Sequence, residues 1–333
     1  MTTTTMTYAD AAKRALAEEM RRDTTVWCVG EDLGRGGVFG QYTGLVDEFG
    51  PQRVSDAPIS EACIMGAAVG AAMMGTRPVV EMRFSDFALC AIDELVNQAA
   101  KARFMFGGQT TVPLVAREPI GMWRSSAAQH SQSLEAWYTH IPGLIVVCPS
   151  TAQDNYLMLK AAIRANDPVV YMEHKNLWGL EGEVDETSDE ASDEAIENII
   201  GKARTVREGR DLTIVSWSST LHEASKAAES IASDGIDAEV IDLRSLWPWD
   251  KAAVYASVRK TGRLLITHEA VSVSGFGAEV AASVSDACFA ALKAPVKRLG
   301  APRAPISYAP TMEAEVSITA EKIAAAATRL AKL

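Results

Sequence analysis

The stretch Glu61-Ala-Cys-Ile-Met-Gly66-Ala-Ala-Val-Gly70-Ala-Ala-Met-Met-Gly75 carries one charge, at its first residue. A helix of this composition is apolar on almost every side, so we expect it deep in the protein or in an interface. Ser60 precedes it and can cap its start. Gly66 and Gly70 lie one turn apart and leave a smooth face for another backbone. A β-rich run at Pro78–Met82 follows and predicts a helix-then-strand unit.

Glu61 has two interpretations. A glutamate in the first turn of a surface helix is ordinary, because the helix dipole favours negative charge there. In a buried helix the same carboxylate must be paired, protonated or used in chemistry, because burying a lone charge is costly. The motifs described below favour the second interpretation.

Helical and strand patterns alternate on both sides of this stretch, which predicts an α/β fold with a largely parallel, buried sheet. The expected helices span Tyr8–Arg22, Glu61–Gly75, Asp86–Arg103 and Thr151–Arg164. The expected strands span Thr25–Gly30, Pro78–Met82, Thr111–Ala116, Leu144–Val147 and Val169–Met172.

An acidic stretch without aromatic residues, residues 181–200, is expected to be an exposed linker, because such a composition cannot bury a core. It separates two expected domains, 1–180 and 201–333. The second is again α/β. Its expected strands are Leu212–Trp217, Ala238–Leu243, Leu264–Thr267 and Val296–Leu299, and its expected helices are Leu221–Ser233, Lys251–Lys260, Gly277–Leu292 and Ile318–Leu333.

Composition excludes several classes of partner. The formal net charge of −11 argues against nucleic acid and anionic membranes. The five cysteines are scattered, odd in number and form no C-x-x-C, so we expect thiols in a reducing, cytoplasmic compartment. The N-terminus lacks the pattern of a signal peptide, and no apolar stretch is both long and glycine-poor enough to predict a membrane span.

Two glycine-rich stretches resemble nucleotide-binding loops only weakly. The loop from Gly30 to Gly37 contains two acids and matches neither phosphate-loop pattern, so we favour a substrate-lining or interface loop. Gly275-Phe-Gly277 lacks the third glycine and the distant acid that dinucleotide binding needs, so it predicts tight strand-to-helix packing.

Two aromatic residues and one histidine could serve a site. Phe84 and Phe87 follow an expected strand and belong either to the core or to a surface that stacks on a planar heterocycle. His130 lies on a polar loop, where it is either simply solvated or able to move protons near neutral pH. The other histidines form no metal cluster, and no Ser-His-Asp order is present.

A series of motifs identifies a family. They are Glu-Asp-Leu-Gly at 31–34, Ala-Pro-Ile-Ser-Glu at 57–61, Arg-Pro-Val-Val-Glu at 77–81, Ala-Ile-Asp at 91–93, His-Ser-Gln at 130–132, Pro-Gly-Leu at 142–144, Asp-Pro-Val-Val at 167–170, Leu-Arg-Ser-Leu-Trp-Pro at 243–248 and Gly-Phe-Gly-Ala-Glu at 275–279. Together they resemble the beta subunit of thiamin-diphosphate-dependent 2-oxo acid dehydrogenases, which include the pyruvate, branched-chain 2-oxo acid and acetoin enzymes. The resemblance covers essentially the whole chain and implies a transketolase-like pyrimidine-binding domain, with a mainly parallel sheet, followed by an α/β transketolase C-terminal domain.

The resemblance also implies roles for single residues. Glu61 would hydrogen-bond the pyrimidine ring of thiamin diphosphate and so activate it. Phe87 would pack on that ring, and Ile59 and Glu31 would belong to the same cofactor site. His130 matches a loop histidine that guides protons and acyl transfer to the lipoyl arm.

A structural potassium site is implied as well. Its ligands would be backbone carbonyls near Leu114, Ala162, Ile163, Ala165 and Asp167. Ala165 stands where the family often has aspartate, a change that backbone ligation would survive.

The family's magnesium–diphosphate motif, Gly-Asp-Gly followed by an Asn pair, is absent from this chain. In the family an alpha subunit carries it, so the resemblance implies an α2β2 heterotetramer with thiamin diphosphate shared between subunits and Mg²⁺ held by alpha. A lipoyl-bearing acyltransferase core would dock on the assembly. The implied reaction cleaves a 2-oxo acid or acetoin beside its carbonyl and transfers the acyl group to lipoamide.

The substrate stays open between three classes. The stretches 124–134 and 173–175 look most like acetoin-type members, while pyruvate and branched-chain 2-oxo acids remain alternatives. A different alternative is a non-catalytic α/β interaction subunit in which Glu61 is only an interface residue.

Overall fold

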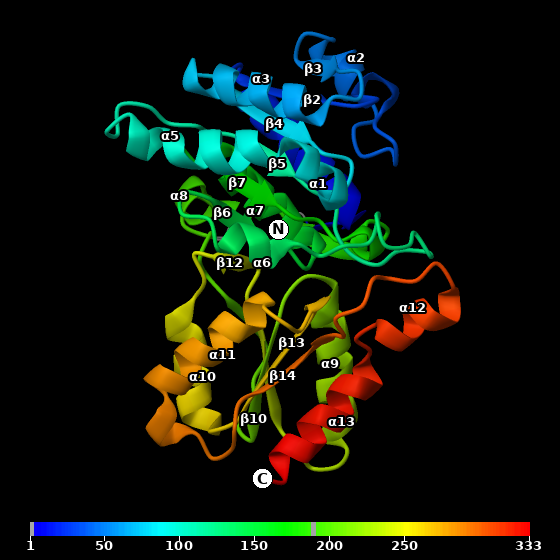
Figure 1. Ribbon diagram of the computed structural model, residues 1–333, viewed down its shortest axis with the longest axis vertical. Coiled ribbons are helices and arrows are strands. Elements are labelled where there is room, and N and C mark those ends of the chain that lie inside the picture. The colour runs from blue at the N-terminus through cyan, green and yellow to red at the C-terminus, as the bar shows by residue number, and fades with distance from the viewer. Residues whose placement is uncertain (1–2, 188–190) are drawn as a thin grey trace. The chain divides into compact units, whose positions relative to one another are not determined.

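The computed structural model describes residues 3–187 and 191–333, which divide into two compact units (Figure 1). The first unit contains the chain up to Ile120 together with Trp137–Ile200. The second contains Gly121–Ala136 together with Gly201–Leu333. Both units combine helices with mainly parallel strands, so the expected α/β class is confirmed.

The sheet of the first unit is parallel throughout its six strands. Their order is β6-β7-β5-β4-β2-β3. Val79, Val115 and Val169 stand in register on neighbouring strands and are buried, as a sheet covered on both faces requires. The strands are β2 (Val26–Gly30), β3 (Val54–Asp56), β4 (Arg77–Glu81), β5 (Val115–Arg117), β6 (Ile145–Val147) and β7 (Val169–Tyr171).

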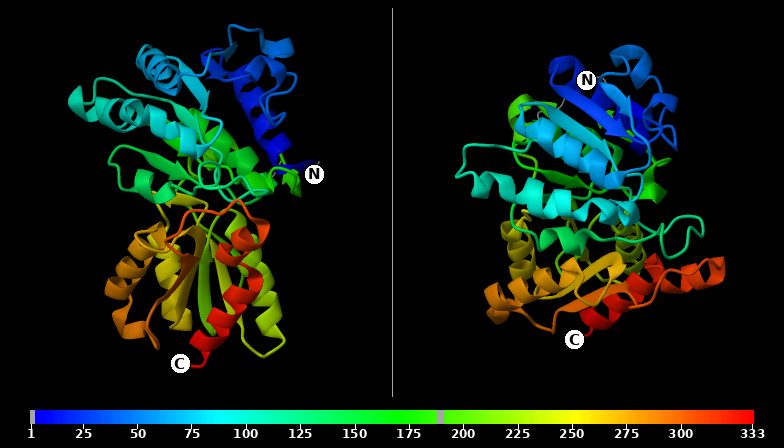
Figure 2. Two further views of the ribbon diagram at one scale, coloured as in Figure 1. Left: turned by 45° about the vertical axis from the view of Figure 1, so that its right-hand side comes forward. Right: turned by 45° about the horizontal axis from the view of Figure 1, so that its top comes forward.

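Helices cover both faces of this sheet. Helices α1 (Tyr8–Arg22) and α7 (Ala152–Arg164) pack against each other on one face. Helix α3 (Glu61–Met73) lies on the opposite face, as the left view of Figure 2 shows for α1 and α3. Threonine caps begin α1 and α7, where the hydroxyls of Thr7 and Thr151 each accept a backbone N–H at 3.1 Å.

The helix predicted over Asp86–Arg103 is replaced by a broken series. Helix α4 (Ser85–Ala88) and a 3-10 turn at Leu89–Ala91 precede a π-helix, η3 (Glu94–Ala99), and then α5 (Ala100–Met105). The prediction of one regular helix is therefore wrong. The stretch contains no glycine or proline that marks the change, and the π-turns lie where the chain packs against α3.

The acidic segment is folded, so the prediction of an exposed linker at 181–200 is wrong where the segment is described. Strand β8 (Glu181–Asp185) pairs antiparallel with β1 (Thr3–Thr7), and helix α8 (Asp193–Glu197) follows. Three apolar side chains spaced among the acids are buried in the core under α1 and α7, namely Val184, Ile196 and Ile199. Residues 188–190 of the predicted linker lie outside the described residues. The remaining short elements of the first unit are η1 (Leu33–Arg35), α2 (Leu45–Phe49), α6 (Glu135–Thr139) and η4 (Lys175–Leu177).

The sheet of the second unit has the order β14-β13-β10-β11-β9, with only β9 antiparallel. Helices α9 and α13 pack together on one face, and α10 and α11 on the other (Figure 2, left). The strands of this sheet are β9 (Arg204–Arg207), β10 (Leu212–Ser216), β11 (Ala238–Asp242), β13 (Leu264–Val271) and β14 (Lys297–Ala301), and the short strand β12 (Ser245–Trp247) lies outside it. The helices are α9 (Ser219–Ala232), α10 (Lys251–Thr261), α11 (Phe276–Ala287), η6 (Phe289–Ala291), α12 (Pro310–Val316) and α13 (Ala320–Ala331).

The Gly275-Phe-Gly277 pair lies where β13 and α11 meet. A Cβ atom on Gly277 would lie 2.8 Å from Nε2 of the buried His268 ring. The predicted tight strand-to-helix packing is thus confirmed. None of the helices in the described residues is long and apolar enough to span a membrane.

Candidate functional site

Glu61 stands at the first position of α3, directly after the carboxyl end of β3 and a short connection. Ser60 does not cap this helix with its side chain, as the sequence suggested. Its hydroxyl donates instead to the carbonyl oxygen of Pro58 at 2.9 Å. The Glu61 side chain is partly exposed on this chain. The apolar burial expected around it is therefore not supplied by the described residues of the first unit.

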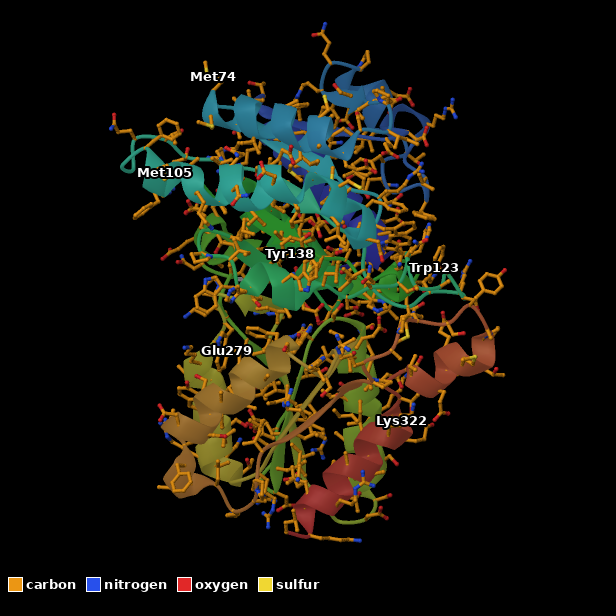
Figure 3. The ribbon with its side chains drawn as sticks, in the orientation of Figure 1. Met74, Met105, Trp123, Tyr138, Glu279 and Lys322 are labelled. Carbon is orange, nitrogen blue, oxygen red and sulfur yellow. The ribbon has the colours of Figure 1, made fainter. Side chains whose placement is uncertain are left out.

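The outward face of α3 is apolar and bare. Ala67 and Gly70 are exposed, and a Cβ atom on Gly70 would meet nothing within 4 Å. Ile59 just before the helix is 76% exposed and Met74 at its end is 85% exposed. Met74 projects outward at the end of α3 in Figure 3, as Met105 does from α5. Only one face of the helix is buried in this chain, so the prediction of a deeply buried helix fails and the interface prediction stays open.

Charged side chains gather at the carboxyl ends of β2 and β4. Arg83 lies with Nη2 2.7 Å from Oδ2 of Asp32 and Nε 3.5 Å from Oε2 of Glu31. Burial raises the pKa of Glu31, the charges of Glu61 and Asp32 raise it further, and Arg83 opposes them. The structure thus places two of the predicted site residues, Glu31 and Glu61, within electrostatic reach of each other.

A buried polar network lies behind these residues. The Tyr42 hydroxyl donates to Oε2 of Glu81 at 2.6 Å and accepts from Nη1 of Arg117 at 2.7 Å. Arg117 in turn donates to Oε2 of Glu173 at 2.5 and 2.8 Å. Burial raises the pKa of Glu81, while Arg117 opposes that shift. Glu31, Tyr42, Glu81 and Arg83 line a small pocket.

Sequence reasoning missed this network, although a signal was present. Three strands of buried apolar residues run into a charged residue at their carboxyl ends, at Glu81, Arg117 and Glu173. Parallel strands share that edge, so the three side chains were bound to meet there. A buried charge is tolerated only with a partner of opposite sign.

The two phenylalanines occupy different environments. Phe84 is buried, with the Nζ atom of Lys175 4.6 Å from its ring centroid. Phe87 is partly exposed on α4, and its ring centroid lies 5.6 Å from that of Phe84. Phe84 is therefore core, and Phe87 keeps a surface that a ligand can reach.

Glu118 was also missed. Its carboxylate is buried at the end of β5, where Oε2 accepts from the Ser85 hydroxyl at 3.1 Å. Burial raises the pKa of Glu118 to about 8. It therefore holds a proton near neutral pH beside α4, the helix that carries Phe87.

His130 belongs to the second unit, on the segment Gly121–Ala136. The predicted site residues therefore fall into two groups. The first unit carries Ile59, Glu61, Phe87 and Glu31, and the second unit carries His130. The sequence predicted a flexible loop here but gave no sign that it folds with residues beyond 200.

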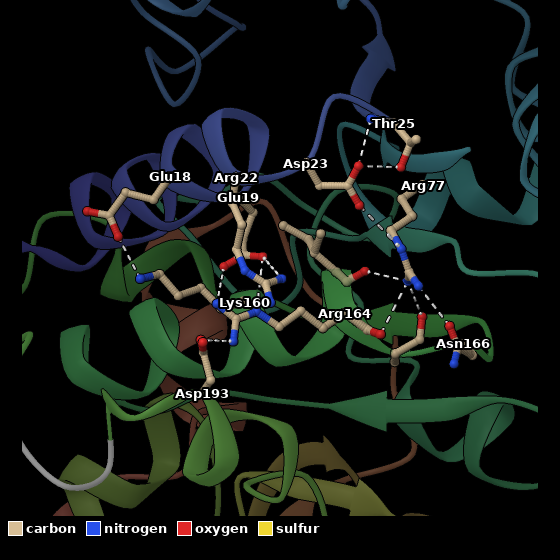
Figure 4. Close-up of polar contacts among 12 residues, drawn as sticks. Glu18, Glu19, Arg22, Asp23, Thr25, Arg77, Lys160, Arg164, Asn166 and Asp193 are labelled. Carbon is tan, nitrogen blue, oxygen red and sulfur yellow. Dashed lines mark hydrogen bonds and ion pairs between the residues drawn. The ribbon is translucent and has the colours of Figure 1, made fainter. Parts of the chain in front are cut away.

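The predicted potassium ligands surround the carboxyl end of α7. Arg77, which lies beside Asn166 in Figure 4, donates from Nη1 to the carbonyl oxygens of Ile163 at 3.0 Å and Ala165 at 2.9 Å. The carbonyl of Leu114 accepts from the Val169 amide at 2.8 Å. A guanidinium already supplies positive charge where a helix end favours it. A potassium ion would have to share these oxygens with Arg77.

Ala162 and Asp167 complete the predicted ligand set. Ala162 is buried in α7, and the Asp167 side chain accepts from Arg103 Nε at 2.6 Å. Within 3–187 and 191–333, no group of three or more His, Cys, Asp or Glu side chains could hold a metal ion.

Comparisons with known proteins agree on one family. Residues 4–179 match the transketolase pyrimidine-binding domain and residues 201–323 match the transketolase C-terminal domain. The chain is 43% identical to the 2-oxoisovalerate dehydrogenase subunit beta of Bacillus subtilis, over 98% of this chain and 99% of the relative. It is also 43% identical to the acetoin:2,6-dichlorophenolindophenol oxidoreductase subunit beta of Cupriavidus necator, over 97% and 96%.

Two further matches come from a plant and from solved structures. The mitochondrial pyruvate dehydrogenase E1 component subunit beta-1 of Arabidopsis thaliana is 45% identical over 92% of this chain and 84% of that protein. A split-gene transketolase, solved as an inactive beta4 tetramer, superposes with a TM-score of 0.78 at 21% identity, over 98% of this chain and 99% of that one. This likeness supports the fold.

Proposed function

The chain belongs to the family of beta subunits of thiamin-diphosphate-dependent 2-oxo acid and acetoin dehydrogenases, and from this membership we propose that it forms the pyrimidine-binding half of a site completed by an alpha subunit. It is an oxidoreductase component that cleaves its substrate beside the carbonyl and passes the acyl group to lipoamide.

The observation that carries the shared-site proposal is the position of Glu61. This carboxylate is the only charge on α3, and it stands where the bare apolar face of that helix begins. A partner that covers this face would exclude water from the carboxylate. The site is therefore open in this chain and would be closed by another.

Four residues of the first unit would hold the cofactor. Thiamin diphosphate, when bound, supplies a nucleophilic carbon for attack on the substrate carbonyl. Glu61 would hold a proton in a hydrogen bond to the pyrimidine ring. The reachable surface of Phe87 would pack on that ring, and Ile59 would lose its exposure against it. Glu31, whose pKa rises with burial and with the Glu61 charge, would share the negative charge there.

His130 would act at the later step. On its segment in the second unit it would move protons as the acyl group passes to the lipoyl arm.

The proposed partners are an alpha subunit in an α2β2 heterotetramer and a lipoyl-bearing acyltransferase core. The absence of Gly-Asp-Gly from this chain supports an alpha subunit that holds Mg²⁺ and the diphosphate. The tip of α5 supports a partner as well, because Phe104, Met105 and Phe106 are 84%, 73% and 53% exposed in succession. Exposed apolar surface of this kind commonly marks an interface.

Two minor assignments complete the proposal. Potassium is proposed for the carbonyls around α7, where it would accompany Arg77. A cytoplasmic location is proposed because none of the five cysteines forms a disulfide, as in a reducing compartment.

The substrate is proposed to be acetoin or a 2-oxo acid. The branched-chain and acetoin relatives are equally similar at 43% identity, so overall identity does not rank these substrates. The stretch 124–134 favours acetoin, with pyruvate and branched-chain 2-oxo acids as the alternatives.

The test is co-expression with an alpha subunit that carries the magnesium–diphosphate motif. The purified complex is assayed with an artificial electron acceptor on acetoin, pyruvate and branched-chain 2-oxo acids. We expect activity that requires thiamin diphosphate and Mg²⁺ and that favours one substrate by about tenfold or more in kcat/KM. Each subunit alone is the control. An assembled, cofactor-bound complex that is inactive on the whole panel would contradict the proposal.

A further inference from the structure

The segment Gly121–Ala136 lies in sequence between two elements of the first unit but folds with the second. It carries His130 near its centre. Figure 3 shows Trp123 of this segment beside α12, and Figure 1 shows the same proximity of the two stretches. Contacts made by the second unit therefore decide the shape of the segment.

Glu269 of β13 holds both arms of the segment. One carboxylate oxygen, Oε1, accepts the backbone N–H of Met122 at 2.7 Å and the hydroxyl of Ser133 at 3.4 Å. Met122 precedes His130 and Ser133 follows it. A single side chain on a rigid strand thus fixes the distance between the two arms.

Glu313 of α12 holds the first arm a second time. Its two carboxylate oxygens lie 3.1 and 3.3 Å from the backbone N of Ser125, which donates to them. Ser317, at the end of α12, donates to the Sδ atom of Met122 at 3.8 Å. The helix therefore meets the segment at two points within four residues.

The backbone between these anchors is strained. Arg124, Ser125 and Ala127 have φ angles of 47°, 59° and 63°. Non-glycine residues adopt this left-handed region at an energetic cost and persist there only where their surroundings impose the conformation. Charge-assisted bonds to backbone N–H groups are strong enough to impose it.

From this geometry we infer that Glu269 and Glu313 are positioning residues, which hold the segment 121–136 in the shape that presents His130. The inference rests on the proposed function of His130 and deepens it. Without the two carboxylates the strained residues relax and the imidazole loses its fixed place. Misplacement by about 1 Å costs up to roughly a hundredfold in rate for a positioned catalytic group.

The experiment uses the assembled complex and five variants. Glu313→Ala and Glu269→Ala remove an anchor, and Glu269→Gln keeps an oxygen that can accept the Met122 N–H. Glu315→Ala is the matched control, because Glu315 lies exposed on the same helix and its side chain has no hydrogen bond in the described part of the chain. His130→Ala serves as the reference for loss of the imidazole.

Three measurements are compared in each variant. Hydrogen exchange at the amides of Met122 and Ser125 reports the anchors directly, and we expect about tenfold faster exchange at the amide whose acceptor is lost. Acyl transfer to a lipoyl domain should fall roughly tenfold in both alanine variants. Turnover with an artificial acceptor should stay within about twofold of wild type. Glu269→Gln should recover most of the acyl transfer, and Glu315→Ala should match wild type.

Two results would overturn the inference. Wild-type exchange at both amides in the alanine variants would show that the carboxylates do not hold the segment. Faster exchange with unchanged acyl transfer, in a complex that His130→Ala does impair, would show that the shape of the segment does not matter. If His130→Ala itself transfers acyl groups normally, the proposed role of His130 fails and the inference with it, while the exchange data still report the anchors.

Discussion

Helices α3 and α7 have the same length, thirteen residues, and belong to the same unit, yet they differ greatly in how many of their side chains are buried. Eleven residues of α7 are buried, including several polar ones, whereas only five residues of α3 are buried and its outer face is apolar. Helix α7 therefore buries polar side chains, which lose water when buried, whereas α3 exposes apolar side chains to water.

The difference shows which of the two helices finds its packing and hydrogen-bond partners within the described part of this chain. Polar side chains of α7 have partners here: the buried Asn155 and Lys160 donate to Glu173 and Glu18. The partly buried Arg164 donates to Glu19, and the last two contacts are visible in Figure 4. The outer face of α3 has no such closure within the described residues. We conclude that α7 stabilises this unit, and the bare face of α3 is the surface on which the proposed alpha subunit would pack.

The largest effect is expected from Glu61→Gln, which removes the single charge of α3. The amide keeps the size of the side chain but cannot accept and release a proton as a carboxyl group does. In the assembled complex, activity should fall by about 10²–10⁴-fold, the range that general acid–base groups carry. Sizing and thermal melting should be unchanged. Turnover within a few-fold of wild type would reduce Glu61 to an interface residue.

On the α7 side, Arg164→Ala should cost stability instead of chemistry. It leaves the Glu19 carboxylate, 2% exposed, without its 2.6 Å partner. Breaking such a pair costs about 3 kcal/mol. That corresponds to a drop of roughly 6–12 °C in melting temperature for a unit of this size.

Arg22→Ala is the matched control for that experiment. Its guanidinium is 48% exposed and lies 3.6 Å from the same carboxylate, so its loss should matter little. Equal melting temperatures for the two variants would show that the α7 network does not stabilise the chain.

Glu118 allows a test by pH, because burial raises its pKa to about 8. The unfolded chain releases this proton near the ordinary glutamate pKa, while the folded chain keeps it. Its contribution is therefore full below about pH 4.3 and is lost as pH rises to about 8, at up to ~1.4 kcal/mol per pH unit.

Glu118→Gln removes this dependence and keeps an oxygen for the Ser85 hydroxyl. As the pH rises from 5.5 to 8, the melting temperature of the variant should rise steadily relative to that of wild type. A difference that stays constant over this range would mean that the carboxyl titrates at an ordinary pKa.

A smaller effect on stability is expected at Gly70. A Cβ atom there meets nothing within 4 Å, so Gly70→Ala should stabilise the isolated chain by about 0.5–1 kcal/mol. Gly70→Leu should fold equally well but weaken assembly with the alpha subunit about tenfold or more, measured as the dissociation constant. Glu229→Leu, which exposes a leucine on α9, is the control. Normal assembly of Gly70→Leu would place the partner elsewhere.

The smallest effect is expected from potassium at the end of α7. Arg77 already occupies two of the proposed carbonyl ligands, so replacing KCl by choline chloride at equal ionic strength should shift the melting temperature by no more than about 1–2 °C. A larger rise specific to potassium would mean that the ion, and not Arg77, closes this helix end.

The elements with local signals were predicted well. Helix α1 was expected over Tyr8–Arg22 and lies there, because an apolar stripe and a threonine cap coincide. The failures arise from contacts distant in sequence. Strand β1 pairs with β8 nearly 180 positions away, and η3 takes π-turns against α3. No local pattern encodes either.

The residues of the candidate site show the same contrast between local signals and contacts that are distant in sequence. Glu61, Phe87 and His130 were proposed for the site because motifs mark them, and they stay proposals. Arg117 and Glu118 were missed, because their importance comes from burial, which strand patterns predict only for apolar residues.

The path of the chain limits how this protein can be cut and recombined. The chain passes from one unit to the other after Ile120, returns after Ala136 and leaves again after Ile200. A gene fragment that begins at residue 201 encodes a second unit without the segment its own Glu269 and Glu313 hold. Exchange of C-terminal halves between relatives would pair those two anchors with a foreign segment, so a working chimera must carry residues 121–136 together with 201–333.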